Sequence, residues 1–81
     1  MTSKQIDQII EVVSKCVHDA WVQDRETNGW QYGAKRNDDL KQSPAMRPYD
    51  ELSEDVKELD RVTVRATLRA LLDLGYTVVK P

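Results

Sequence analysis

Cysteine, glycine, proline and histidine are all scarce in this sequence of 81 residues, which contains one cysteine, three glycines, three prolines and one histidine. Because Cys16 stands alone, it cannot form an internal disulfide, and no covalent framework supports the core. Cys16 and His18 are the only soft metal ligands, and side chains two positions apart on a helix point in different directions. A disulfide scaffold and a structural zinc site are therefore excluded, and we expect no metal and no cofactor.

Surplus positive charge and long hydrophobic runs are missing as well. Twelve Lys and Arg residues stand against fourteen Asp and Glu residues, which gives a net charge of −2. Non-specific affinity for nucleic acid depends on surplus positive charge, so a general nucleic-acid binder is excluded. No apolar run approaches the roughly 20 residues of a membrane span, and the N-terminus leads into an amphipathic segment instead of a signal peptide. We therefore expect a cytoplasmic protein with no membrane insertion and no nucleic-acid partner.

The length corresponds to one small domain covering residues 1–81, because typical domains run to about 100–150 residues. A chain this short buries only about 60% of the surface that its unfolded form exposes, so its core is marginal. If that core is too small, the chain needs a partner or a second copy of itself.

Two segments have the periodicity of amphipathic helices. The first runs from about residue 3 to residue 25, with Ser3 as its candidate N-cap. Its apolar stripe consists of Ile6, Ile9, Ile10, Val13, Val17 and Ala20. The second begins at Ser53, carries acidic residues in its first turns and arginines later, as the helix dipole favours, and ends at Gly75, which suits the left-handed terminal position. We therefore predict a mainly α fold with two long packed helices.

The connection between the helices is long and rich in aromatic residues. Residues 28–48 contain four of the six Gly and Pro residues, and a loop of about 20 residues is usually functional or disordered. Its aromatic side chains favour a loop that folds back onto a helix. Trp30 and Tyr32 alternate around Gln31, which indicates a very short strand with both rings on one side. We expect this strand to pair with residues 76–79 as a minor two-stranded antiparallel sheet that rests on the helices.

The second helix is apolar on two sides. Its main apolar face consists of Val56, Leu59, Thr63, Ala66, Ala70 and Leu74, and a separate stripe consists of Val64, Leu68 and Leu72. A helix that is apolar on two sides has to be covered twice, and a two-helix protein offers only one neighbouring helix. The separate stripe therefore points to an interface with another copy or another domain, unless the aromatic loop or the final strand covers it.

One group of residues on the first helix could bind a ligand. Ser14, His18, Trp21 and Arg25 follow each other at intervals of 4, 3 and 4 residues. Side chains at these intervals share one face. A ring partly anchored in the core, one turn from a guanidinium, suits a planar ligand that carries negative charge. The alternative is that Trp21 lies at the edge of the core and that Arg25 stacks on it or pairs with a carboxylate.

The segment around Gly29 and Gly33 adds two rings and a cation, since Trp30 and Tyr32 lie close to Arg36. The spacing of the glycines matches neither the P-loop nor the dinucleotide fingerprint. This segment is therefore a candidate binding loop without a recognised phosphate motif.

Catalysis finds little support in the sequence. A nucleophile needs an adjacent base and an orienting group, and the chain has a single cysteine in mid-helix and a single histidine. We therefore do not expect an enzyme.

A row of cations at intervals of four residues follows the second helix, namely Lys57, Arg61, Arg65 and Arg69. Such a row could offer a ridge that binds an anion, but rows of charge at this spacing are usually solvated helix faces.

Several of these segments, taken in order, resemble the ryanodine-receptor repeat domain family. The matching residues begin with His18-Asp19-Ala20-Trp21, Arg25, Gly29-Trp30-Gln31-Tyr32-Gly33 and Arg36-Asn37-Asp38-Asp39. The later ones are Pro44, Pro48-Tyr49, Leu52-Ser53-Glu54, Lys57, Asp60-Arg61 and the run Leu68-Arg69-Ala70-Leu71-Leu72-Asp73-Leu74-Gly75-Tyr76. The resemblance covers roughly residues 4–79.

This resemblance implies a fold and a class of function. Members of the family have two main helices, a long irregular connection and short strands, and in calcium-release channels they occur as tandem pairs in the cytoplasmic shell. A homodimer of this chain would restore such a pair. Some repeats hold an adenine nucleotide near the His-x-x-Trp helix, and the matching positions here are Trp21 and Arg25.

The first of two functional hypotheses is a non-enzymatic ligand-binding module. Trp21, together with Trp30 or Tyr32, would stack a nucleotide base, which contributes about 1–3 kcal/mol. Arg25 and Arg36 would contact the phosphates of the same ligand.

The second hypothesis is a structural interaction module with no small-molecule ligand. The aromatic residues would then belong to the core, and the stripe of Val64, Leu68 and Leu72 would bind a partner or a second copy of the chain.

Overall fold

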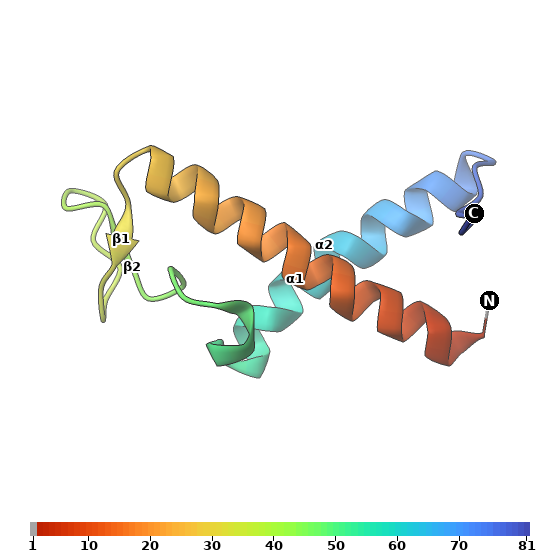
Figure 1. Cartoon of the computed structure of the whole chain (residues 1–81), viewed down its shortest axis with the longest axis horizontal. Helices are drawn as coiled ribbons and strands as arrows, with labels where there is room; N and C mark the ends of the chain where they lie inside the picture. Colours follow the sequence, from red (N-terminus) through yellow and green to blue (C-terminus); the bar gives the residue numbers. More distant parts are fainter. Residues whose placement is uncertain (1) are drawn as a thin grey trace.

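Two helices that cross in an X dominate the structure, a computed structural model that describes residues 2–81. Along the chain the elements are α1 (Ser3–Thr27), β1 (Gln31–Tyr32), β2 (Gln42–Ser43), the 3-10 helix η1 (Tyr49–Glu51) and α2 (Glu54–Asp73). The strand pair lies at one end of the molecule and both termini lie toward the other (Figure 1). The predicted mainly α fold with two packed helices is confirmed. Within the described residues, neither helix has the length and apolarity that crossing a membrane requires.

Capping residues next to the helices explain where they begin and where α2 ends. Thr2 precedes α1 and forms a capping box with Gln5, in which the side chain of each residue accepts the backbone N–H of the other. The hydroxyl of Ser53 caps α2 by accepting the N–H of the third residue after it. Gly75 follows α2 with a φ of +92°, which glycine adopts without steric cost. The first helix thus starts where expected, but its cap is Thr2 and not Ser3.

The strand pair differs from the prediction in its partner and in its direction. β1 and β2 are parallel, with Gln31 beside Gln42 and Tyr32 beside Ser43, whereas the expected pair was antiparallel and used residues 76–79. Those residues form no strand. The physical reason is the length of α2. A helix of 20 residues spans about 30 Å and carries the C-terminal segment to the end of the molecule opposite β1 (Figure 1).

A tight return of the chain allows parallel pairing across so short a connection. Asn37 and Gln42 exchange two backbone hydrogen bonds of 2.9 Å, and Lys41 between them has a φ of 52°. The chain therefore reverses before β2 and passes β1 in the same direction. Gly33 permits the close approach of the strands, because a Cβ added there would lie 2.6 Å from the Cβ of Gln42.

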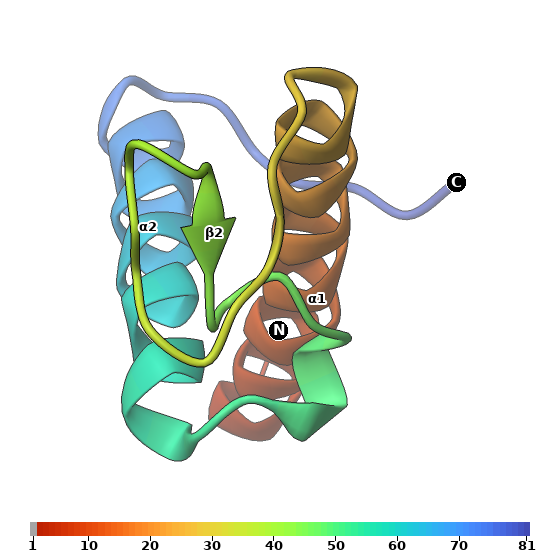
Figure 2. The same ribbon diagram turned by 90° about the vertical axis from the view of Figure 1, so that its left-hand side faces the viewer.

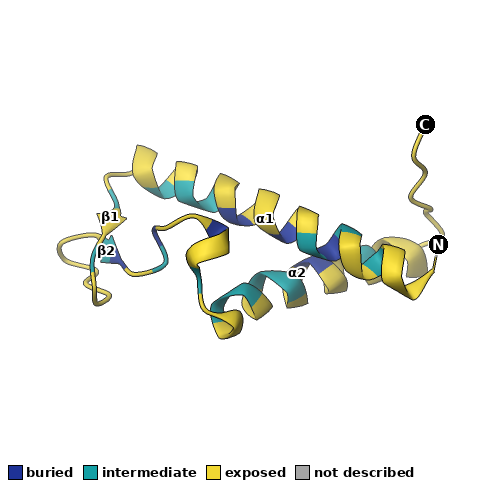
Figure 3. Cartoon of the chain, turned by 60° about the horizontal axis from the view of Figure 1, so that its bottom comes forward, coloured by how far each residue is buried: buried dark blue, intermediate teal, exposed yellow. Residues whose placement is uncertain are grey.

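The core is small and partly polar. Its buried residues are Ile10, Ser14 and His18 on α1, Ser43, Met46 and Tyr49 in the connection, and Val64 on α2. The buried positions of α1 face α2 (Figure 3), and Ser14 is fully buried among them. The apolar stripe expected on α1 is only partly covered, because Val13 and Val17 are 39% and 37% exposed. Packing therefore uses a row displaced toward Ser14 and His18.

α2 turns a different face toward α1 than its apolar pattern indicates. Val64 is buried, Leu68 is half-buried beside it, and only Leu72 of the stripe assigned to an external interface is exposed. Leu59 of the expected main face is 69% exposed. Arg61, three residues before Val64, holds this side of α2 on α1 through an ion pair described below. Most of the separate stripe is thus covered by the first helix of the same chain.

Candidate functional site

Two tryptophans and an arginine meet where α1 ends. The guanidinium carbon of Arg25 lies 5.5 Å from the ring centroid of Trp21 and 5.3 Å from that of Trp30. Trp21 precedes Arg25 by four residues and so lies on the same face of α1. A turn at Gly29, where φ is +87°, returns Trp30 to the helix, and the N–H of Trp30 donates to the carbonyl of Arg25 at 2.9 Å. We call these three residues the Trp–Arg–Trp unit.

Within residues 2–81, Arg25 is the one arginine without an ion pair. Each of the other five forms at least one, and their partners are all Asp or Glu. The Nε of Arg25 is buried and has no hydrogen-bond partner among the described residues. The faces of two indoles contact this guanidinium, where the other five arginines have a carboxylate.

A recess of about 170 Å³ opens beside Trp21. It is lined by His18, Trp21, Ala45, Val56, Leu59 and Asp60. This volume is below the roughly 300–1,000 Å³ of a site for a whole drug-sized ligand, so the recess can take only part of one. Burial raises the pKa of Asp60, although the neighbouring His18 acts in the opposite direction. Across residues 2–81 no group of three or more His, Cys, Asp or Glu side chains is placed to hold a metal.

His18 joins α1, the connection and α2 next to this recess. The ring is 3% exposed, and its Nε2 lies 2.7 Å from the carbonyl oxygen of Arg47. Because a carbonyl only accepts, Nε2 carries the proton and donates. Nδ1 lies 3.6 Å from a carboxylate oxygen of Asp60, and the ring packs on Trp21 and Tyr49 at centroid distances of 5.7 and 6.1 Å. Nε2 is thus hydrogen-bonded and Nδ1 faces a carboxylate, so His18 links α1 to the connection and lies close to α2 beside Trp21.

Glu11, Arg61 and Tyr49 form a second polar junction between the same three segments. Arg61 donates to both carboxylate oxygens of Glu11, at 2.7 and 3.1 Å, and the hydroxyl of Tyr49 donates to Glu11 at 3.0 Å. The hydrogen bonds from Arg61 hold the pKa of Glu11 below its ordinary value. Burial, and then the bond to Glu11, raises the pKa of Tyr49. This junction fixes α2 and the connection on α1 and leaves none of its charges unpaired.

Comparison with protein families adds an independent finding to this geometry. The sequence profile of the RyR domain matches residues 1–80. The chain belongs to the RyR domain family. The match spans one copy of the domain and confirms the resemblance seen in the sequence.

The RyR domain places the other two residues predicted to bind a ligand away from the Trp–Arg–Trp unit. Arg36 pairs with Asp38 at 2.8 Å on the exposed segment between the strands. The ring of Tyr32 lies against Arg47, whose guanidinium carbon is 5.4 Å from its centroid. Trp30 and Tyr32 therefore have different partners, and the aromatic residues of the connection do not gather into one cluster.

The sequence analysis assigns no role at the site to three residues that shape it in this RyR domain. Arg47 supplies the carbonyl that binds His18, Asp60 lines the recess, and Arg61 was assigned to a solvated row. A weak signal exists for two of them. Asp60 and Arg61 precede Val64 by four and three residues, and side chains at this spacing share one helix face. Their position on the same face as an apolar residue could therefore have indicated that these two polar side chains take part in packing.

Proposed function

We propose that this RyR domain is a non-enzymatic binding module for an adenine nucleotide or a similar phosphate-bearing small molecule. The observation that supports this most is the state of Arg25. It lacks an acidic partner within residues 2–81, whereas the other five arginines each have one. Two indoles hold its guanidinium in place. A positioned guanidinium whose charge is not already used suits a phosphate, which it can bind through two parallel hydrogen bonds.

In this proposal the base contacts Trp21 from the recess. Trp21 lines the recess, and Arg25 lies four residues further along α1, about 6 Å along the helix axis. The carboxylate of Asp60 can accept a hydrogen bond from an exocyclic amino group such as that of adenine. Contact with an indole contributes roughly 1–3 kcal/mol per base, so the expected affinity is modest.

Binding without turnover is proposed because the chain offers no histidine that is free to act as a general base at this position. His18 is the only histidine, and each of its ring nitrogens already faces a protein oxygen. A nucleophile beside it would lack the adjacent base that activation requires.

Calorimetry against ATP, AMP and cyclic AMP tests the proposal. Arg25→Gln removes the charge but keeps a long polar side chain, and it should weaken binding by roughly 10- to 100-fold, the value of a charge-assisted hydrogen bond. Trp21→Leu should also reduce the affinity. The matched control is Arg65→Gln, because Arg65 is an exposed arginine of α2. Absence of binding heat in the wild type, or equal affinity in Arg25→Gln, would show that the proposal is wrong.

A different observation favours the second candidate, an interaction module that has no small-molecule ligand. Large apolar side chains are exposed on both helices, among them Val12 and Val13 on α1 and Leu71 on α2. A protein that binds none of the nucleotides but self-associates, or binds another protein, would have this function.

A further inference from the structure

Two grooves meet on one side of the helix pair and form a continuous depression. Their volumes are about 470 and 250 Å³, and both are lined by Ile9, Val13 and Val78. The smaller one continues between the helices and is further lined by Val17, Thr63, Val64, Thr67, Leu68 and Leu71. We call the two together the helix-pair groove. It shares no lining residue with the recess beside Trp21, so the two sites are separate.

The C-terminal segment forms one wall of this groove. After the turn at Gly75, the segment leaves the end of α2 and runs past α1 (Figure 2). Val78 of this segment thereby lines both parts of the groove. The larger part alone lies within the roughly 300–1,000 Å³ of a small-molecule site, so the groove has room for a ligand of that size.

The part of the groove between the helices offers no hydrogen-bond donor to a ligand. The only hydroxyls among its lining residues belong to Thr63 and Thr67. Each of them already donates to a backbone carbonyl of α2, at 3.2 and 2.8 Å. A buried polar group without a partner costs free energy. The portion of a ligand that lies between the helices therefore has to be apolar.

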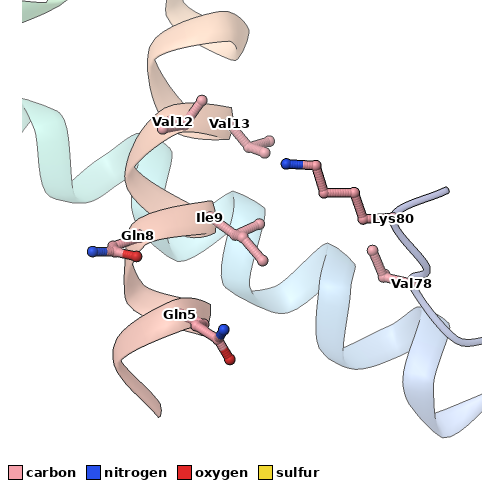
Figure 4. Close-up of a pocket in the computed structure, with 7 residues that line it drawn as sticks. All are labelled: Gln5, Gln8, Ile9, Val12, Val13, Val78 and Lys80. Carbon is pink, nitrogen blue, oxygen red and sulfur yellow. The ribbon is translucent and has the colours of Figure 1, made fainter. Parts of the chain in front are cut away.

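The larger part of the groove contains a cation. Lys80 is the one charged residue among those that line the groove, and its side chain extends from the C-terminal segment toward Val13 (Figure 4). Two other lysines pair with acidic side chains, whereas Lys80 has no such partner within residues 2–81. Gln5 lines the same part. Its Oε1 accepts the N–H of Thr2 at 2.8 Å, which leaves its amide nitrogen as a donor. This part is therefore suited to an anionic group.

We propose that the helix-pair groove binds a hydrocarbon chain that ends in a carboxylate, as in a fatty acid. The hydrocarbon lies between the helices against Val17, Leu68 and Leu71, and the carboxylate pairs with the ammonium of Lys80. The two ends of such a ligand match the two parts of the groove, one apolar and the other cationic. Because covering the ammonium with a neutral molecule would leave its charge unpaired, Lys80 selects an anionic ligand over a neutral one of the same length.

Calorimetry of the full chain with decanoate, below its micelle concentration, tests the proposal. The wild type should bind decanoate more tightly than decanol, and decyltrimethylammonium more weakly than either. Lys80→Met keeps an extended apolar side chain without the charge. It should weaken the binding of decanoate by roughly fivefold, the value of an exposed ion pair, and leave that of decanol unchanged. Val13→Gln places an amide where the two parts of the groove meet and should weaken the binding of both.

Lys35→Met is the matched control, because Lys35 is an exposed lysine of the connection, and it should bind decanoate as the wild type does. Lys80→Arg keeps the charge and should retain most of the affinity. Val13 is 39% exposed, so a helical circular dichroism spectrum of Val13→Gln would show that this variant folds.

Three results would overturn the proposal. The first is equal affinity of Lys80→Met and the wild type for decanoate, and the second is equally tight binding of decyltrimethylammonium, which would indicate unspecific adsorption of the hydrocarbon. The third is an absence of binding heat in the wild type, and sedimentation of that protein as a dimer would then assign the groove to a second copy. Binding of ATP is measured separately, so failure of this proposal is distinguishable from failure of the nucleotide site.

Discussion

Two polar side chains on the packed side of α1 each bind both of the other segments of the chain. His18 donates to a carbonyl of the connection and faces a carboxylate of α2, and Glu11 accepts from a tyrosine of the connection and from an arginine of α2. Hydrogen bonds restrict distance and angle, whereas apolar contact is non-directional. The two junctions therefore specify the rotation of α2, which explains why Val64 and not Leu59 packs on α1.

The junction at Glu11 predicts how stability depends on pH. The pKa of Glu11 is lowered in the folded protein, chiefly by the hydrogen bonds from Arg61. Its contribution to stability is therefore present above the unfolded pKa of about 4.3 and is lost as pH falls through the lower, folded pKa. Glu11→Gln should lower the melting temperature at pH 7 by roughly 5 °C. The difference from the wild type should shrink on acidification, as thermal scans from pH 7 to pH 3 would record.

Glu26→Gln is the control for this experiment, because it makes the same change at an exposed position of α1. Its melting temperature should follow that of the wild type at every pH. A gap between Glu11→Gln and the wild type that stays constant down to pH 3 would contradict the assignment of the stabilisation to the ionised carboxylate.

At the scale of elements, the strand pair is short but it positions part of the candidate site. β1 and β2 contain two residues each, and their backbone bonds run from Gln31 to Lys41 and from Gly33 to Ser43. β1 directly follows Trp30, so the pair holds the chain on the path that brings this ring to Arg25. Two strands alone are marginal in water, and the pair therefore depends on close packing at Gly33.

Gly33→Ala should loosen the strand pair. The added Cβ would lie 2.6 Å from the Cβ of Gln42, too close for the backbones to remain where they are. Amide hydrogen exchange at Gln31 should accelerate by roughly tenfold, and Trp30 fluorescence should shift as the ring leaves Arg25. Lys35→Ala in the same segment introduces no such contact and should leave both signals unchanged. Unaltered exchange at Gln31 in Gly33→Ala would mean that the approach to Gln42 is not limiting.

The whole molecule is extended, with dimensions of 43 × 22 × 21 Å. Across residues 2–81 the buried apolar side chains are few, namely Ile10, Met46, Tyr49 and Val64. Hydrophobic burial is the dominant favourable term in folding, so a chain with this core gains much of its stability only when further apolar surface is covered. In the second candidate function, in which the chain self-associates, folding and association are therefore coupled.

That coupling predicts a melting temperature that depends on protein concentration. Association stabilises the folded state by mass action, so the melting temperature of a self-associating wild type should rise as the protein concentration rises. Differential scanning calorimetry over a hundredfold range of concentration would measure this. A wild-type melting temperature that is constant across the range would indicate that the single chain is stable by itself.

Local features of the sequence were sufficient to locate the helices and part of the site. Periodicity and caps act within a few residues, so the bounds of α1 and α2 follow closely from the pattern, and the four-residue spacing of Trp21 and Arg25 brings those side chains together on one helix. The position of Trp30 is less local, because it requires the turn at Gly29 as well as the helix.

The sequence by itself determined the family, the two helices and the pairing of Trp21 with Arg25, because each depends on order and spacing along the chain. Only the tertiary structure decided which face of α2 is buried, which strand pairs with β1, and that Arg25 has no acidic partner within residues 2–81. These outcomes rest on contacts such as those of His18 with Arg47 and of Glu11 with Arg61, which join residues 29 and 50 positions apart. At such separations several pairings satisfy the same local pattern, and the geometry of the packed chain selects among them.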